Sequence, residues 1–150
     1  MFQAKDIVPA DAVYYGCDGF DGIDNVEGFD ITSIPQKVTM LSHFNSKATD
    51  GMAKEFIDKY VAKFGADTLN QFGASAYDCV YALYGAMKAA IDAGKEIPVT
   101  ISASDLCDIL KEQFEGGYTV EKAVTGENIT WESTGYVNKG AIQYVIKDAN

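Results

Sequence analysis

An aspartate directly after an apolar segment is the residue whose type and position best suit binding chemistry. Residues 12–16 form a short apolar run that ends in glycine, which is the pattern of a buried parallel strand. Asp18 follows at once, in a loop rich in Gly and Asp that extends to Gly28. Ligands of open α/β sheets bind at the carboxyl ends of strands, where a carboxylate is a charge-assisted acceptor for a cationic group. The alternative is a solvated loop aspartate that forms a turn.

The same loop carries acidic residues at every third position, which raises the question of a calcium site. EF-hand loops space their ligands two apart, with glycine at the sixth position and glutamate at the twelfth, and that pattern is absent. We therefore expect a solvated acidic loop and no metal. The acidic positions are Asp18, Asp21, Asp24, Glu27 and Asp30.

Catalytic motifs are missing from the sequence. The single histidine, His43, follows Ser42 on an expected strand, and adjacent strand residues point to opposite faces, so the two do not form a hydrolytic pair. No Gly-x-Ser-x-Gly turn, dinucleotide-binding glycine motif or Walker loop is present. The sequence predicts that the protein is not an enzyme and that it uses no cofactor.

Composition and charge exclude further classes. The chain has 150 residues, of which 47% are apolar, and this suits a soluble globular protein with a real core. The formal net charge of −10 repels nucleic acid, and no basic stripe overcomes it locally. Three cysteines at unrelated spacings form neither a disulfide framework nor a zinc signature, although one disulfide remains open. Cys79 and Cys107 lie in apolar helical contexts, where a thiol behaves as a small hydrophobe.

Strands are expected before helices along the chain. A second strand covers residues 37–44, and its pairing with the first would be parallel. Three helices follow at residues 52–64, 72–93 and 102–114, with Thr49 or Asp50 as the first N-cap and Ser102 as the last. On the long helix we expect the large apolar residues to line one face, with the tyrosines in the core or at an interface. They are Tyr77, Val80, Tyr81, Tyr84, Met87 and Ile91.

The last part of the chain predicts two more strands, at residues 128–131 and 141–146, around a turn at 133–135. The fold class is therefore α/β. A parallel sheet needs covering helices on both faces, and the consecutive helices here cover one face at most. We therefore expect strands upstream of Met1 to complete the sheet.

The order of these landmarks resembles the leucine/isoleucine/valine-binding protein family, from about Ala12 to Ile146. Each short motif is weak alone, but five in the right order are specific. The motifs are Val13–Gly16 with Cys17–Phe20, the strand ending at Ser42–Phe44, the helix Phe56–Gly65, the segment Ala74–Leu83, and Val124–Trp131 with Gly135.

This resemblance implies the C-terminal portion of a type I periplasmic-binding-protein fold, with two lobes joined by crossovers. Residues 1–41 would belong to the C-terminal lobe and residues 42–127 to the helical part of the N-terminal lobe. Residues 128–150 would form the return crossover and the last strand of the C-terminal lobe. In such proteins the ligand lies between the lobes and drives hinge closure.

The resemblance also implies ligand-binding residues. The acidic residue at the position of Asp18 pairs with the α-ammonium group of the ligand, within the loop that contains Gly19 and Phe20. Phe72 aligns with an aromatic position that contacts ligand from the other lobe, although a phenylalanine at a helix start is also a common core residue. Phe20 is expected near the mouth of the pocket.

The function implied is the extracellular solute-binding component of an ABC importer for branched-chain or other amino-acid-like solutes. Its partners would be the ligand, the transmembrane subunits of the permease, and either the missing N-terminal half of the protein or a second copy. The full-length protein would be periplasmic or a membrane-anchored lipoprotein, although residues 1–8 contain no signal peptide. Two alternatives are a ligand-sensing domain of a receptor with the same fold and a self-associating interaction domain.

Overall fold

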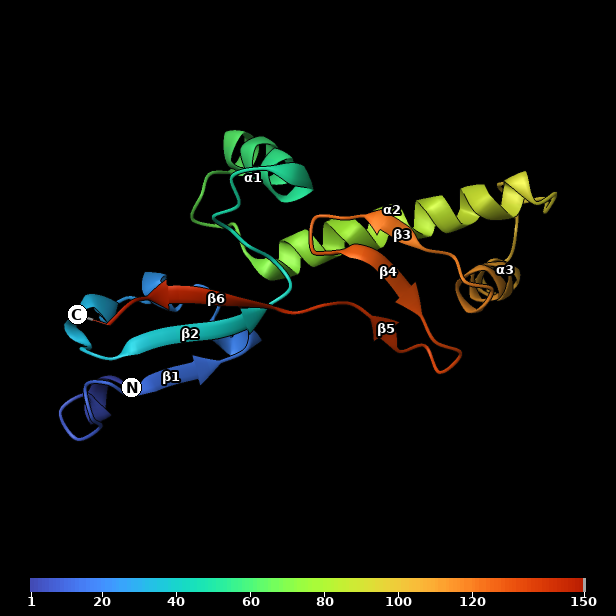
Figure 1. Ribbon diagram of the computed structural model, residues 1–150. Helices are drawn as coiled ribbons and strands as arrows, with labels where there is room; N and C mark the ends of the chain where they lie inside the picture. Colours follow the sequence, from blue (N-terminus) through green and yellow to red (C-terminus); the bar gives the residue numbers. More distant parts are fainter. Residues whose placement is uncertain (150) are drawn as a thin grey trace. The chain divides into compact units, whose positions relative to one another are not determined.

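The computed structural model describes residues 1–149 as a mixed α/β chain (Figure 1). Its α-helices are α1 (Gly51–Phe64), α2 (Gln71–Asp92) and α3 (Ala103–Glu115). Its strands are β1 (Val13–Gly16), β2 (Lys37–Ser42), β3 (Val120–Lys122), β4 (Glu127–Trp131), β5 (Val137–Asn138) and β6 (Ile142–Lys147). Short 3-10 helices are η1 (Phe2–Ala4), η2 (Asp18–Phe20), η3 (Ile23–Asn25) and η4 (Ile31–Ser33).

Contacts along the chain divide it into two compact units. The first unit contains Met1–Gln71 and the segment from Ala141 onward, and the second contains Phe72–Gly140. These boundaries differ from the lobe boundaries expected after residues 41 and 127, because α1 groups with β1, β2 and β6. The assignment of lobes stays a prediction.

The first unit is built on a sheet in the order β1-β2-β6 (Figure 1). β1 and β2 are parallel, with Tyr14 opposite Val38, and this confirms the predicted parallel pair. β6 is antiparallel to β2, with Tyr144 opposite Met40. The chain therefore returns from the second unit to place its last strand beside the middle strand of the first.

β1 is more exposed than the sequence pattern predicted. Val13 and Tyr15 are 40% and 63% exposed, and both point to the same side of the strand. β1 is an edge strand with β2 as its one neighbour, whereas Val38, Thr39 and Met40 of β2 are buried on both faces. The prediction of a buried first strand was wrong, because an apolar run does not report the position of a strand in its sheet.

A buried glutamine ties the segment before β1 to the start of β2. Gln36 is fully buried, and its Nε2 donates to the carbonyl oxygens of Lys5 at 2.9 Å, Val8 at 2.8 Å and Pro9 at 3.3 Å. These bonds satisfy backbone groups of an irregular segment that has no sheet partners of its own. The core below them contains Ile31, Ile34, Val38, Met40, Phe44 and Phe56.

Within the first unit, α1 packs against the segment that follows β2 through aromatic rings. Phe44, just after β2, contacts Phe56 edge to face with ring centroids 5.9 Å apart. Phe56 also contacts Tyr60, with their ring centroids 5.5 Å apart. The helix begins after Asp50 and its C-cap is Gly65, which has a positive φ of 83°. These are the predicted helix ends, although the Asp50 side chain makes no capping hydrogen bond.

The second unit carries an antiparallel sheet in the order β3-β4-β5. The turn predicted at 133–135 connects β4 to β5, with Glu132 and Tyr136 bonded across it at 2.8 Å. The expected partner of β4 was the strand at 141–146, and that pairing is wrong because β6 joins β2 instead. β3 and β5 are short, at three and two residues, and the sequence pattern did not reveal them.

α2 buries its small residues rather than its large ones. Its buried positions recur every four residues and include Ala74, Asp78, Ala82, Ala86 and Ala90. Val80, Tyr81 and Tyr84 are more than half exposed, so they do not lie in the core, and their role at an interface stays a prediction. Small side chains allow close approach, and a Cβ added at Gly85 would lie 1.9 Å from the hydroxyl oxygen of Tyr118.

Asp78 fastens the β3–β4 connection to α2. Its Oδ1 accepts from the backbone N–H of Val124 at 2.8 Å, and its Oδ2 accepts from the N–H of Thr125 at 2.8 Å and from Thr125 Oγ1 at 2.5 Å. All three residues are buried. Hydrogen bonds to a carboxylate are stronger than neutral ones, so this contact fixes the helix against the sheet.

Within residues 1–149, none of the helices has the combination of length and apolar character that crossing a bilayer requires.

Replacing Asp78 with alanine is expected to lower the free energy of unfolding by about 2–4 kcal/mol, because two buried N–H groups and a hydroxyl lose their acceptor. Urea unfolding followed by circular dichroism measures the change. Asp108→Ala, at an exposed aspartate of α3, is the matched control and should shift stability by less than about 0.5 kcal/mol. Equal midpoints for the two variants would show that the Asp78 contact contributes nothing.

Candidate functional site

The loop after β1 places Asp18 at the carboxyl end of the strand, where it was predicted to lie. Asp18–Phe20 form the single turn of η2, closed by bonds from Phe20 N to Cys17 O at 2.8 Å and from Asp21 N to Asp18 O at 3.1 Å. Asp18 and Gly19 are exposed and Phe20 is half-buried. The carboxylate is therefore accessible to a solute, and its role in binding stays a prediction.

Phe20 folds back over the end of β1. A Cβ added at Gly16 would lie 2.2 Å from the Cγ atom of the Phe20 ring, which real Cβ atoms do not approach. Glycine at position 16 is therefore required for this ring position. The ring in turn fixes η2 and holds Asp18 beside the strand end.

Asp21, the next acidic residue, has a structural role that the sequence did not reveal. Its Oδ2 accepts a 2.7 Å hydrogen bond from the backbone N–H of Gln71, the first residue of α2. The first N–H groups of a helix have no partner within the helix, and a carboxylate there also complements the helix dipole. The two residues are 50 positions apart, so no local capping pattern reported the contact.

A buried polar pair adjoins this cap. Gln71 is 7% exposed and Ser42, at the end of β2, is 2% exposed. Ser42 Oγ lies 3.1 Å from Gln71 Oε1 and accepts from Phe44 N at 3.0 Å. Among the residues described, Gln71 Nε2 has no hydrogen-bond partner, which is unusual for a buried donor.

A cavity of about 220 Å³ opens beside the loop, with groups of both charges at its wall. Asp21 and Asp24 contribute carboxylates, Lys47 an ammonium, and Phe20 an apolar ring. On the β6 side, the hydroxyl of Tyr144 lies 3.1 Å from that of Ser46. The cavity has the size and polarity to accept part of a small polar solute.

The four predicted ligand residues divide between the two units. Asp18, Gly19 and Phe20 share one turn in the first unit, and of these Phe20 lines the cavity. Phe72 follows Gln71 directly but belongs to the second unit, where it is 59% exposed. A ligand role for Phe72 stays a prediction.

Two aspartates of the acidic segment accept structural hydrogen bonds, one from a distant residue and one from a neighbour. Besides Asp21, Asp30 accepts from Thr32 N at 2.9 Å and Thr32 Oγ1 at 2.6 Å, and these bonds lower the pKa of Asp30. In the part of the chain that the structure covers, no three His, Cys, Asp or Glu side chains lie together as metal ligands. The loop spacing therefore reflects caps and turns at these two positions.

The two residues considered as a hydrolytic pair differ in burial. Ser42, the last residue of β2, is buried, whereas His43 follows the strand and is exposed. Cys17, Cys79 and Cys107 are free thiols. All three are exposed, so the expectation that Cys79 and Cys107 behave as small hydrophobes in apolar surroundings was wrong.

Replacing Gly16 with alanine is expected to displace the Phe20 ring and lower the free energy of unfolding by about 1–3 kcal/mol, as overpacking does. Gly19→Ala is the matched control, since a Cβ there meets nothing within 4 Å. Chemical denaturation of both variants measures the difference. If Gly16→Ala lowers the free energy of unfolding no more than Gly19→Ala does, the Phe20 ring does not rest on Gly16.

Comparison with known proteins gives a structural likeness. No protein-family profile matches the chain, and no curated protein sequence matches it. Among solved structures, it is similar to the substrate-binding protein LivJ of the branched-chain amino acid transporter from Streptococcus pneumoniae, which was solved in complex with isoleucine. The TM-score is 0.55 and the identity is 22%.

The match covers 95% of this chain and 40% of LivJ, so the chain spans less than half the length of that protein. At this identity the likeness concerns the fold. The chain is therefore a mixed α/β protein whose fold is similar to a fragment of the periplasmic-binding-protein fold of LivJ.

Proposed function

We propose that this chain is part of an extracellular solute-binding protein that delivers branched-chain or other amino-acid-like solutes to an ABC importer. The observation that carries the proposal is the fold likeness to LivJ over 95% of the chain. A fold alone hosts many functions, so the ligand class must come from the site. The protein would function through binding and release, without chemistry on the solute.

The proposed ligand-binding residues are Asp18, Gly19, Phe20 and Phe72. Asp18 would pair with the α-ammonium group of the solute, and its exposed position after β1 supports this role. Phe20 would contribute an apolar wall at the edge of the neighbouring cavity, and Phe72 a second aromatic surface. A carboxylate selects cationic groups, so neutral solutes of the same size would bind more weakly.

Exposed apolar surface supports the participation of further polypeptide. Val80, Tyr81 and Tyr84 form an uncovered apolar surface on α2, and Val13 and Tyr15 form another on β1. Contiguous apolar patches on soluble proteins usually mark interaction sites. We propose that the N-terminal half of the same protein covers them, with self-association as the alternative.

The proposed location and partners follow from the importer function. The whole protein would act outside the cytoplasm, as a periplasmic protein or a membrane-anchored lipoprotein. It would dock on the transmembrane subunits of the permease when loaded with solute. Both statements rest on the fold likeness.

The 150-residue chain by itself is expected to bind free amino acids poorly. Half a cleft leaves the solute carboxylate without its donors, and an unpaired partner of a buried charge costs about 2–5 kcal/mol. Isothermal calorimetry with leucine, isoleucine and valine tests this. Micromolar binding by the chain alone would contradict the expectation that part of the site lies elsewhere.

The decisive experiment uses the protein encoded by the full reading frame that contains this chain. We expect saturable binding of an amino-acid-like solute from a panel of all common amino acids, and Asp18→Asn should reduce its binding free energy by about 2–5 kcal/mol. Asp11→Asn, at an exposed aspartate before β1, is the matched control. Absence of binding to every member of the panel would overturn the function, whereas undiminished binding by Asp18→Asn would overturn the site alone.

A further inference from the structure

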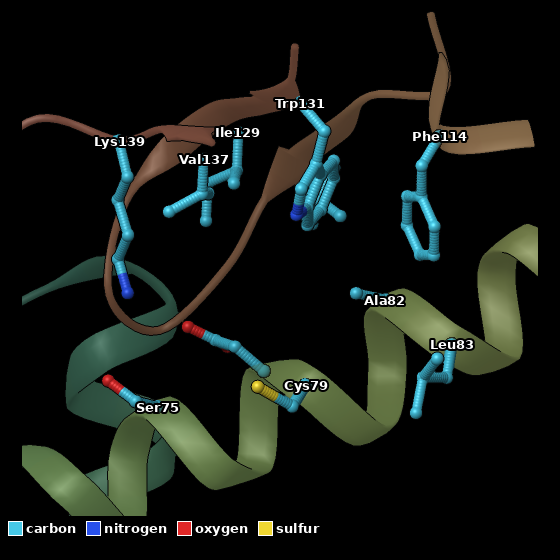
Figure 2. A pocket seen from close by; sticks show the side chains of 11 residues that line it. Ser75, Cys79, Ala82, Leu83, Phe114, Ile129, Trp131, Val137 and Lys139 are labelled. Carbon is cyan, nitrogen blue, oxygen red and sulfur yellow. The ribbon is translucent and has the colours of Figure 1, made fainter. Parts of the chain in front are cut away.

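The second unit contains a cavity of about 350 Å³ between α2 and the β4–β5 hairpin (Figure 2). Ser75, Cys79 and Ala82 of α2 form one side, and Ile129, Trp131 and Val137 of the hairpin form the other. Figure 2 shows the hairpin side chains pointing toward the helix, with Phe114 at one end of the space and Lys139 at the other. The cavity lies entirely within residues 72–140, so it is separate from the loop after β1.

Two features keep this space open. On the helix side, the buried residues are small, and Ala82 leaves room that a larger side chain would fill. On the opposite side, the rings of Trp131 and Phe114 are in contact, with centroids 4.5 Å apart and planes inclined by 52°, and they hold each other in place. An apolar cavity of about 150 Å³ already binds benzene, so this larger one accommodates an aromatic ring with a short chain attached.

The end of the cavity near Lys139 is polar, because it contains a charged ammonium group. Lys139 is half-buried, and burial lowers the pKa of its ammonium group. The carboxylate of Asp78 also lines the cavity and partly offsets the effect of burial on Lys139, but its two oxygens accept from Val124 and Thr125. No acceptor for Lys139 is found in the described part of the chain. A partly buried ammonium with three donors and no acceptor favours a ligand that supplies one.

We propose that this cavity binds a small organic monoanion with an apolar or aromatic body, and that the carboxylate of this ligand pairs with Lys139. The body lies against Trp131, Phe114 and Ile129, where apolar contacts stabilise it. The carboxylate lies at the Lys139 end, near Ser75. The neutral hydrogen-bond donors of the wall are the Ser75 hydroxyl, the Cys79 thiol and the Trp131 indole.

The chemistry of the cavity disfavours other ligand classes. An amine would place its charge beside Lys139 and be repelled, and the Asp78 carboxylate of the same wall already accepts three hydrogen bonds from Val124 and Thr125. A free amino acid would bring an α-ammonium group next to the same lysine, so the site does not suit the solutes proposed for Asp18. The inference is therefore independent of the proposed function, and each can fail without the other.

Calorimetric titration of the whole chain with 3-phenylpropionate tests the proposal. We expect saturable binding, with 3-phenylpropanamide and 3-phenylpropan-1-amine at least about tenfold weaker because they lack the charge or reverse it. Lys139→Met keeps most of the length of the side chain and removes its charge. It should weaken the binding of 3-phenylpropionate to the affinity measured for the amide. Lys122→Met, at an exposed lysine of β3, is the matched control and should bind like the wild type.

A footprint on the thiols locates the ligand even if Lys139→Met folds poorly. Cys79 lines the cavity, whereas Cys17 and Cys107 do not, and all three are exposed. Saturating 3-phenylpropionate should slow alkylation of Cys79 by iodoacetamide in the wild-type chain, with the rates of the other two unchanged. The proposal is overturned by absence of saturable binding, by equal affinity for the amide, or by equal protection of the three thiols.

Discussion

The contact between Asp78 and the 124–125 backbone determines how the second unit is arranged. A helix face of alanines offers little apolar area, because each alanine buries few atoms. What fixes the sheet on that face is a carboxylate that accepts two backbone N–H groups and a hydroxyl from residues 46 and 47 positions away. The same contact engages both oxygens of Asp78, and Lys139 of the same cavity wall has no acceptor within residues 1–149. One buried charge therefore shapes both the packing and the chemistry of the cavity beside it.

Local signals predicted much of the fold. The positions of α1, α2 and α3 follow from helical periodicity together with caps at Gly65 and Ser102, and the Ser102 side chain accepts from Asp105 N as a capping box does. The parallel pairing of β1 and β2 also follows from two apolar runs. The helices and their caps depend on neighbouring residues, which a sequence displays directly.

The errors concern interactions between distant residues. The sequence displays large apolar residues on α2, but whether they are covered depends on polypeptide that packs there, and the structure packs small ones instead. Likewise, the strand at Ile142–Lys147 looked like the hairpin partner of β4 because it is the next long apolar run. The two-residue strand β5 forms the hairpin instead, and β6 pairs with residues about a hundred positions earlier. For the site, the rule that ligands bind at strand ends located Asp18. The same rule could not distinguish a binding role for Asp18 from the structural role of Asp21, whose carboxylate accepts from Gln71.

The buried amide of Gln36 has a mechanical consequence. Its three bonds join the carbonyls of residues 5, 8 and 9 to the start of the central strand, so tension applied at the amino end reaches β2 without passing through the peripheral strand. β1 and the turn that contains Asp18 lie outside this path. A single uncharged side chain thus keeps this tension away from the loop that follows β1.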